Sequence, residues 1–84
     1  MAPTLGAQVA AASVAARLRG PAAGLERLDA LLGEPGAARF QPWWAVRAHL
    51  LVQVGRPAEA AVAYERALAL TKDDRVRPYL RSLL

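Results

Sequence analysis

GRPAEAAVAYERALAL, residues 55–70, is the stretch in which a turn, a helix start and a packing pattern coincide. Gly55 suits the left-handed position just past a helix end, and Pro57 suits the first turn of the next helix. After this corner, small and apolar residues recur at spacings of three and four, as on one face of an amphipathic helix. The stretch therefore predicts a helix whose alanine-rich face allows close approach of a neighbour, with Tyr64 as its one large packing side chain.

The same register extends upstream over residues 41–54. The tetratricopeptide pattern is W-x2-L-G-x2-Y, then A-x3-F, then P. When Ala60 and Tyr64 are aligned with A-x3-F, Trp44, Ala48 and Leu51 take the places of the pattern's tryptophan, glycine and tyrosine. Arg47 takes the place of the pattern's leucine, and Lys72 takes the place of its proline. Residues 41–74 thus resemble one tetratricopeptide repeat. The predicted structural positions are Trp44, Ala48, Leu51, Gly55, Ala60, Tyr64 and Ala67.

The rest of the chain predicts further helices. Thr4 is a candidate N-cap for a helix over residues 5–19, which Gly20 ends, and residues 21–32 carry a leucine stripe closed by Gly33. These two helices form a predicted hairpin over about 5–33, which reads as a first, degenerate repeat. Gly24, Leu25, Leu28, Leu31 and Leu32 make up its stripe.

The second hairpin spans about 42–71, with Gln41 and Pro42 as the cap and first residue of its opening helix. An apolar side in residues 74–83 predicts a short C-terminal helix that caps the stack. We therefore expect one domain over residues 1–84. Its fold class is all-α and tetratricopeptide-like, with two antiparallel helix hairpins and a capping helix.

Composition limits the classes of function. The 84 residues include no cysteine, which excludes disulfides and cysteine-ligated zinc, and no apolar run approaches the length of about 18 residues that a membrane span needs. The opening residues lack the basic region of a signal peptide, so we expect a helix there and a cytoplasmic protein with no membrane contact. The net charge of +4 permits acidic partners without requiring nucleic acid.

Three motifs resemble one bacterial family. They are GPAAGLxxLDAL at 20–31, RAxLLxxxGRxxEAxxAYxRALAL at 47–70 and the ending YLRSLL at 79–84. Together they look like the tetratricopeptide-type C-terminal extension of extracytoplasmic-function RNA polymerase sigma factors, in which an arginine at the Arg47 position is usual. The resemblance implies a protein-protein interaction module that helps a sigma factor engage polymerase or a regulator. The promoter-reading domains of a sigma factor are absent from these 84 residues.

A binding surface can be predicted from the register of the two repeats. Helix positions that face the concave side in this repeat class form a candidate partner-binding groove, and a solvated or partner-buried surface is the alternative interpretation. The groove residues are Ser13, Arg17, Ala45, His49, Val52 and Gln53. His49 is the single histidine and has no cluster of ligands around it, so we expect no metal site.

Two further residues are candidate interface anchors. Trp43 lies one helical step from the repeat tryptophan, which predicts an exposed side chain, with partial burial against residues 33–41 as the alternative. Val9 lies on the first helix, which has no preceding repeat to cover it, and we expect this open end to dock the rest of a sigma-like chain or a second copy. Between the hairpins, the alignment predicts a buried or half-buried ion pair of Arg47 with Asp29.

No arrangement of residues predicts catalysis. No nucleophile has a recognisable base partner and no glycine-rich phosphate loop precedes a helix, so we expect a non-enzyme that needs no cofactor. Two alternatives to a protein-binding module stay open: a nucleic-acid-contacting accessory domain of a transcription factor, and a structural homo-oligomerisation unit. The first would use Arg75, Arg77 and Arg81 near the chain end, although Asp73 and Asp74 beside them make direct nucleic-acid contact the weaker hypothesis.

Overall fold

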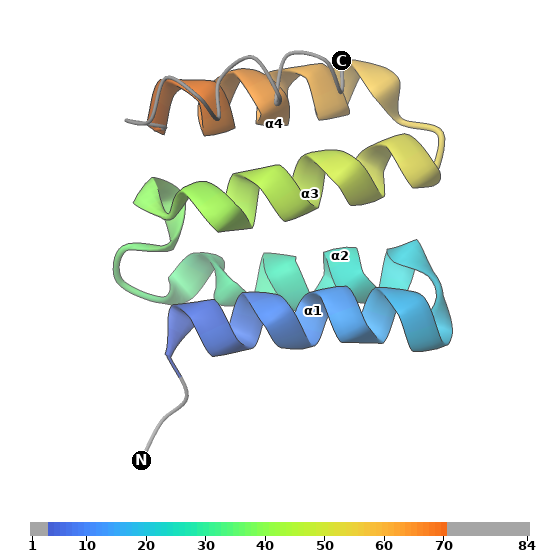
Figure 1. Cartoon of the computed structure of the whole chain (residues 1–84), viewed down its shortest axis with the longest axis horizontal. Coiled ribbons are helices and arrows are strands. Elements are labelled where there is room, and N and C mark those ends of the chain that lie inside the picture. Colours follow the sequence, from blue (N-terminus) through green and yellow to red (C-terminus); the bar gives the residue numbers. More distant parts are fainter. Residues whose placement is uncertain (1–3, 71–84) are drawn as a thin grey trace.

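The computed structural model describes residues 4–70, which form helices joined by short connections. This part of the chain contains no strand, which confirms the predicted all-α class. The helices pair into two hairpins, and α3 lies between α4 and the first hairpin (Figure 1). The elements are α1 (Leu5–Arg19), α2 (Pro21–Ala30), the 3-10 turns η1 (Leu31–Gly33) and η2 (Ala37–Arg39), α3 (Gln41–Gln53) and α4 (Pro57–Leu70).

Glycine and proline set the helix ends where the sequence predicts them. Thr4 caps α1 with its hydroxyl oxygen, and Gly20 alone separates α1 from α2. Gly55 has a φ of 78°, in the left-handed region, and its N–H donates to the Val52 carbonyl at the end of α3. Pro57 then begins α4, so the corner between the last two helices is the one predicted.

Two helix boundaries differ from the prediction. The α-helix α2 ends at Ala30 and the chain tightens into η1, which keeps Leu31 buried but leaves Leu32 54% exposed. Leu32 was expected on the buried stripe, and the change from α-helical to 3-10 geometry turns it outward. In the second hairpin, Phe40 instead of Gln41 is the cap residue of α3.

The core lies where the two hairpins meet. Its largest fully buried side chains are Trp43, Leu28 and Leu51, and alanines fill the narrower seam between α3 and α4. Burial of Tyr64 at 3% exposure confirms it as the large packing side chain of α4. The predicted structural positions that are buried are Ala48, Leu51, Ala60, Tyr64 and Ala67.

Gly24 marks the closest approach of the helices. A Cβ atom at this position would lie 2.8 Å from the Ala12 carbonyl oxygen and from the Ala16 Cβ of α1, and 2.8 Å from Leu50 Cδ1 of α3. A side chain at residue 24 would force its neighbours to shift, because 2.8 Å is shorter than an ordinary Cβ contact and the Ala12 oxygen belongs to the backbone of α1. The absence of a side chain at residue 24 therefore lets both hairpins pack closely.

The predicted capping helix over residues 74–83 lies outside the described residues, as does the end of the predicted second hairpin at Thr71. Arg75, Arg77 and Arg81, the candidates for nucleic-acid contact, also lie there. Within residues 4–70, no helix is both long enough and apolar enough to cross a bilayer.

Candidate functional site

The two adjacent tryptophans of α3 exchange their predicted roles. Trp43 is 1% exposed, and its indole N–H donates a buried hydrogen bond of 2.9 Å to the Leu28 carbonyl of α2. Trp44 is half-buried at the core margin, where its indole N–H donates to the Ala38 carbonyl at 2.9 Å and the Arg66 guanidinium lies 5.9 Å from its ring centre. The prediction of Trp43 as an exposed anchor is wrong, because the first hairpin packs on the face of α3 that Trp43 occupies.

Arg47 and Asp29 form the predicted ion pair between the hairpins, but Asp29 is exposed, so only the Arg47 side of the pair is half-buried as predicted. Arg47 Nη1 donates to Asp29 Oδ1 at 2.6 Å, with 21% and 57% of the two side chains exposed. The same guanidinium lies 5.4 Å from the ring centre of Trp43, a cation–π geometry. Asp29 of α2 is therefore paired with Arg47 of α3, whose side chain is mostly buried.

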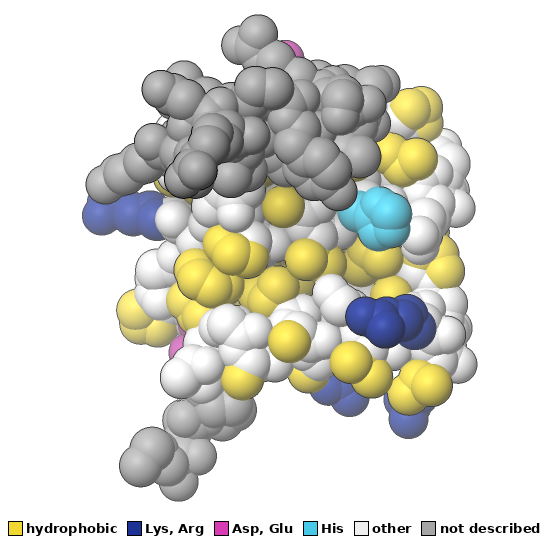
Figure 2. Space-filling view, in the orientation of Figure 1, with side chains coloured by type: hydrophobic (Ala, Val, Ile, Leu, Met, Phe, Trp, Pro, Cys, Tyr) yellow, Lys and Arg dark blue, Asp and Glu magenta, His cyan; other side chains and the backbone are white. Residues whose placement is uncertain are grey.

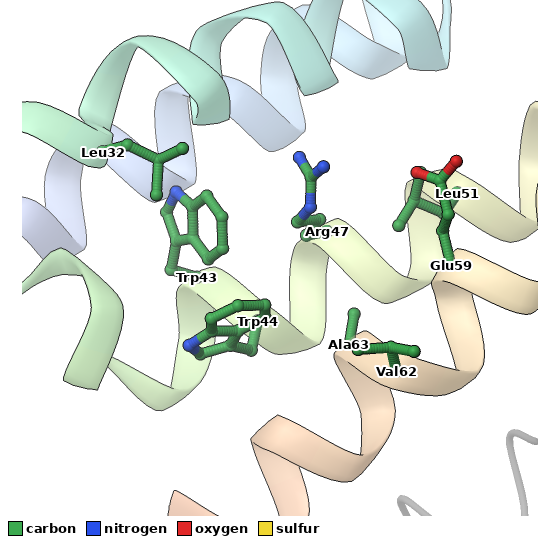
Figure 3. A pocket seen from close by; sticks show the side chains of 8 residues that line it. All are labelled: Leu32, Trp43, Trp44, Arg47, Leu51, Glu59, Val62 and Ala63. Atoms are coloured by element: carbon green, nitrogen blue, oxygen red, sulfur yellow. The ribbon is translucent and has the colours of Figure 1, made fainter.

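A pocket of about 330 Å³ lies beside this ion pair, between η1, α3 and α4 (Figure 3). Of its lining residues, Leu32 and Val62 are 54% and 55% exposed, and Glu59 accepts a hydrogen bond of 3.1 Å at Oε1 from Arg56 Nε. No nucleophile beside a base lines the pocket. Most of its lining side chains are apolar, which suits the insertion of an apolar side chain. It is lined by Leu32, Trp43, Trp44, Arg47, Leu51, Glu59, Val62 and Ala63.

Figure 2 shows apolar side chains gathered between α1 and α3, with the single histidine, His49 of the predicted groove, beside them. Ser13 and Ala45 are half-buried, and the other four groove residues are exposed. His49 Nε2 and Gln53 Nε2 lie 3.0 Å apart. None of the six lines the pocket beside the ion pair or the hollows of the first hairpin, and the use of this face as a groove stays a prediction.

The outer side of the first hairpin carries a second exposed surface, which we call the α1–α2 edge. Val14 is 49% exposed and Leu18 is 78% exposed, the largest exposure among the large apolar side chains described. Three adjoining hollows of about 360, 320 and 270 Å³ follow this side of the hairpin. The edge consists of the residues that line these hollows: Ala7, Gln8, Ala11, Val14, Ala15, Leu18 and Arg19 of α1, Ala23, Glu26, Arg27 and Ala30 of α2, and Leu31 of η1.

Val9 does not belong to the α1–α2 edge. It is 3% exposed and packs in the core, so the prediction of Val9 as a docking anchor is wrong. The helical turn points Val9 inward and places Val14 and Leu18 outward. These two residues were not predicted from the sequence. The available signal was the series Ala7, Ala11, Val14 and Leu18, whose members are three or four residues apart along the helix.

No group of three His, Asp or Glu residues that could hold a metal ion occurs within the described part of the chain. Comparison of the chain with models of protein families, with curated proteins and with solved structures finds no match. The function is therefore inferred from the exposed surfaces of the two hairpins.

Proposed function

We propose that this chain is a non-catalytic protein-protein interaction module, built as a tetratricopeptide-like pair of helical hairpins. The observation that carries the proposal is the α1–α2 edge, where Val14 and Leu18 are half and more than three-quarters exposed above adjoining hollows. Contiguous exposed apolar surface on a small domain is typical of a docking site. In a stack of helical hairpins, this is the side on which another helix would pack.

The resemblance to sigma-factor extensions supports a cellular context for the module. We infer that it works in the cytoplasm, where its partner is the remainder of a sigma-like chain, RNA polymerase or a regulator. The motifs at 20–31 and 47–70 support this inference, since they cover α2 and most of the second hairpin.

The experiment is selection of binders from a phage-displayed library of helical peptides against the purified chain. We expect the selected peptides to bind the wild-type chain and to lose at least about tenfold in affinity for the double variant Val14→Ser/Leu18→Ser, because apolar contacts supply most of the binding free energy. Both substituted residues are exposed, so thermal melts should show that the variant remains folded.

The matched control is Val52→Ser, which changes an exposed valine of similar accessibility, at 50%, in the predicted groove on α3. Peptides that lose affinity for this variant alone would assign binding to the groove and contradict the use of the α1–α2 edge. Failure to select any peptide that distinguishes the variants would contradict an interaction module of this kind.

A nucleic-acid contact is the second candidate, favoured by the exposed Arg17, Arg19 and Arg27 on the first hairpin. Phosphate binding by these arginines would make affinity for a DNA duplex fall steeply with salt. We expect no such binding near physiological salt, because the same surface carries Val14 and Leu18, which phosphates do not satisfy. Salt-dependent binding of a duplex that Arg19→Glu/Arg27→Glu abolishes would favour the second candidate instead.

A further inference from the structure

The junction between the two hairpins is an example, within this molecule, of one helix packed on the face of another. There, α2 lies against α3, and an acidic residue of the incoming helix, Asp29, pairs with an arginine of the receiving face, Arg47, at 2.6 Å. Leu50 of α3 belongs to the same receiving face and packs closely on α2, because its Cδ1 would lie 2.8 Å from a Cβ at Gly24. The internal seam thus combines close apolar packing with an acid-to-arginine pair across the boundary.

The α1–α2 edge occupies the corresponding place on the first hairpin. When Gly20 is aligned with Gly55 and Pro21 with Pro57, Leu50 corresponds to Ala15 and Ala63 to Arg27. Ala15 and Arg27 both line the hollows of the edge, whereas Leu50 and Ala63 face the junction with the first hairpin or its pocket. The edge is therefore a receiving face of the same kind, without a described helix upon it.

The charge of this edge differs from that of an ordinary apolar patch. Arg19 and Arg27 line its hollows, and neither forms an ion pair within residues 4–70, where the ion pairs found are Arg47–Asp29 and Arg56–Glu59. Glu26 is the single acidic residue that lines the hollows. Two arginines against one glutamate leave the edge net positive, so an acidic partner complements it better than a second copy that carries the same positive edge.

We propose that the α1–α2 edge binds an amphipathic helix of a partner protein whose apolar stripe is flanked by acidic residues; this deepens, and rests on, the interaction function proposed above. The helix packs its apolar stripe on Val14, Leu18 and the small alanine surfaces between them, and its carboxylates pair with Arg19 and Arg27. The edge extends along α1 from Ala7 to Arg19, which corresponds to about 18 Å, or about 12 residues of the bound helix.

The probe is a synthetic helical peptide of about 16 residues with leucines in an i, i+3, i+4, i+7 stripe and glutamates beside it. A matched peptide carries lysine in place of each glutamate. Fluorescence anisotropy should show that the wild-type chain binds the glutamate peptide about tenfold more tightly than the lysine peptide, because two ion pairs are replaced by like-charge contacts. In the variant Arg19→Glu/Arg27→Glu this preference should reverse.

Arg39→Glu is the charge control, with half the charge change of the double variant, since Arg39 is exposed on η2 and lines none of the hollows of the edge. It should keep the wild-type preference for the glutamate peptide. An equal loss in this control would show a general charge effect and overturn the proposal. Thermal melts of all variants check that each remains folded.

The outcomes separate the partner chemistry from the interaction function. Equal binding of both peptides that is lost in Val14→Ser/Leu18→Ser would overturn the acidic partner and leave the interaction function standing. Binding of neither peptide, together with library selections that the Val14→Ser/Leu18→Ser variant does not affect, would overturn both. Light scattering that shows a dimer broken by Val14→Ser/Leu18→Ser would identify a second copy as the occupant and overturn the acidic helix.

Discussion

At the scale of single residues, Gly24 decides how closely the helices pack. Gly24→Ala adds a methyl group 2.8 Å from atoms of both α1 and α3, so we expect the free energy of unfolding to fall by about 1 to 3 kcal/mol. This overpacking outweighs the intrinsic preference of a helix for alanine, which is about 1 kcal/mol. Urea denaturation followed by circular dichroism measures the change.

Gly6 offers the control for this substitution. A Cβ at Gly6 in α1 would meet its nearest neighbours, Phe40 and Thr4, at 3.9 Å, an ordinary contact. Gly6→Ala should therefore stabilise the chain by about 0.5 kcal/mol through helix propensity and a less flexible unfolded state. Equal and favourable effects of both substitutions would contradict the close packing at residue 24.

The tryptophans give a second prediction at this scale. Trp43→Phe removes the buried hydrogen bond to the Leu28 carbonyl and leaves a gap in the core, so it should cost about 2 to 3 kcal/mol of stability. Trp44→Phe, at the half-buried neighbour, should cost less than about 1 kcal/mol. Chemical denaturation of the two variants compares them directly, and a larger loss for Trp44 would restore the role that the repeat pattern assigns to it.

At the scale of helices, the Arg47–Asp29 pair joins the two hairpins unequally. Asp29 is 57% exposed, so Asp29→Ala should cost at most about 1 kcal/mol, and less at high salt. Arg47 is 21% exposed and covers the Trp43 ring, so Arg47→Ala should cost about 1 to 2 kcal/mol through lost packing that salt does not screen. Stability measurements at low and high salt would show equal costs if the ion pair alone mattered.

The helices themselves could be predicted because glycine and proline mark their ends. Gly55 before Pro57 and Gly20 before Pro21 leave few alternatives for where the chain turns. The inner and outer faces were harder to predict: adjacent helical residues such as Trp43 and Trp44 point about 100° apart, and packing of a distant hairpin decides which one is covered.

The candidate site was predicted less well than the helices. Alanine is compatible with a buried or an exposed helix face, so the alanine-rich α1 does not show from its sequence which side faces the core. Val9 was therefore assigned to the open end in place of Val14 and Leu18. Arg27 carries no pattern signal of its own, since its place beside α1 arises only when the hairpin closes.

At the scale of the whole molecule, two hairpins leave α1 and α2 with one side that no described helix covers. Arginines border that side, and the internal seam between the hairpins pairs an arginine with an acid. We infer that a partner helix docks on this side, in preference to the face of α1 and α3 that carries His49.

Chemical-shift mapping shows which of the two faces binds the helix. The ¹⁵N-labelled chain is titrated with the glutamate peptide, and the amide signals that move are placed on the structure. We predict that the largest shifts fall on residues 11–19 and 23–30, with small shifts at Ala45, His49 and Val52. Shifts concentrated on those three residues, or no saturable shifts on the first hairpin, would contradict the account.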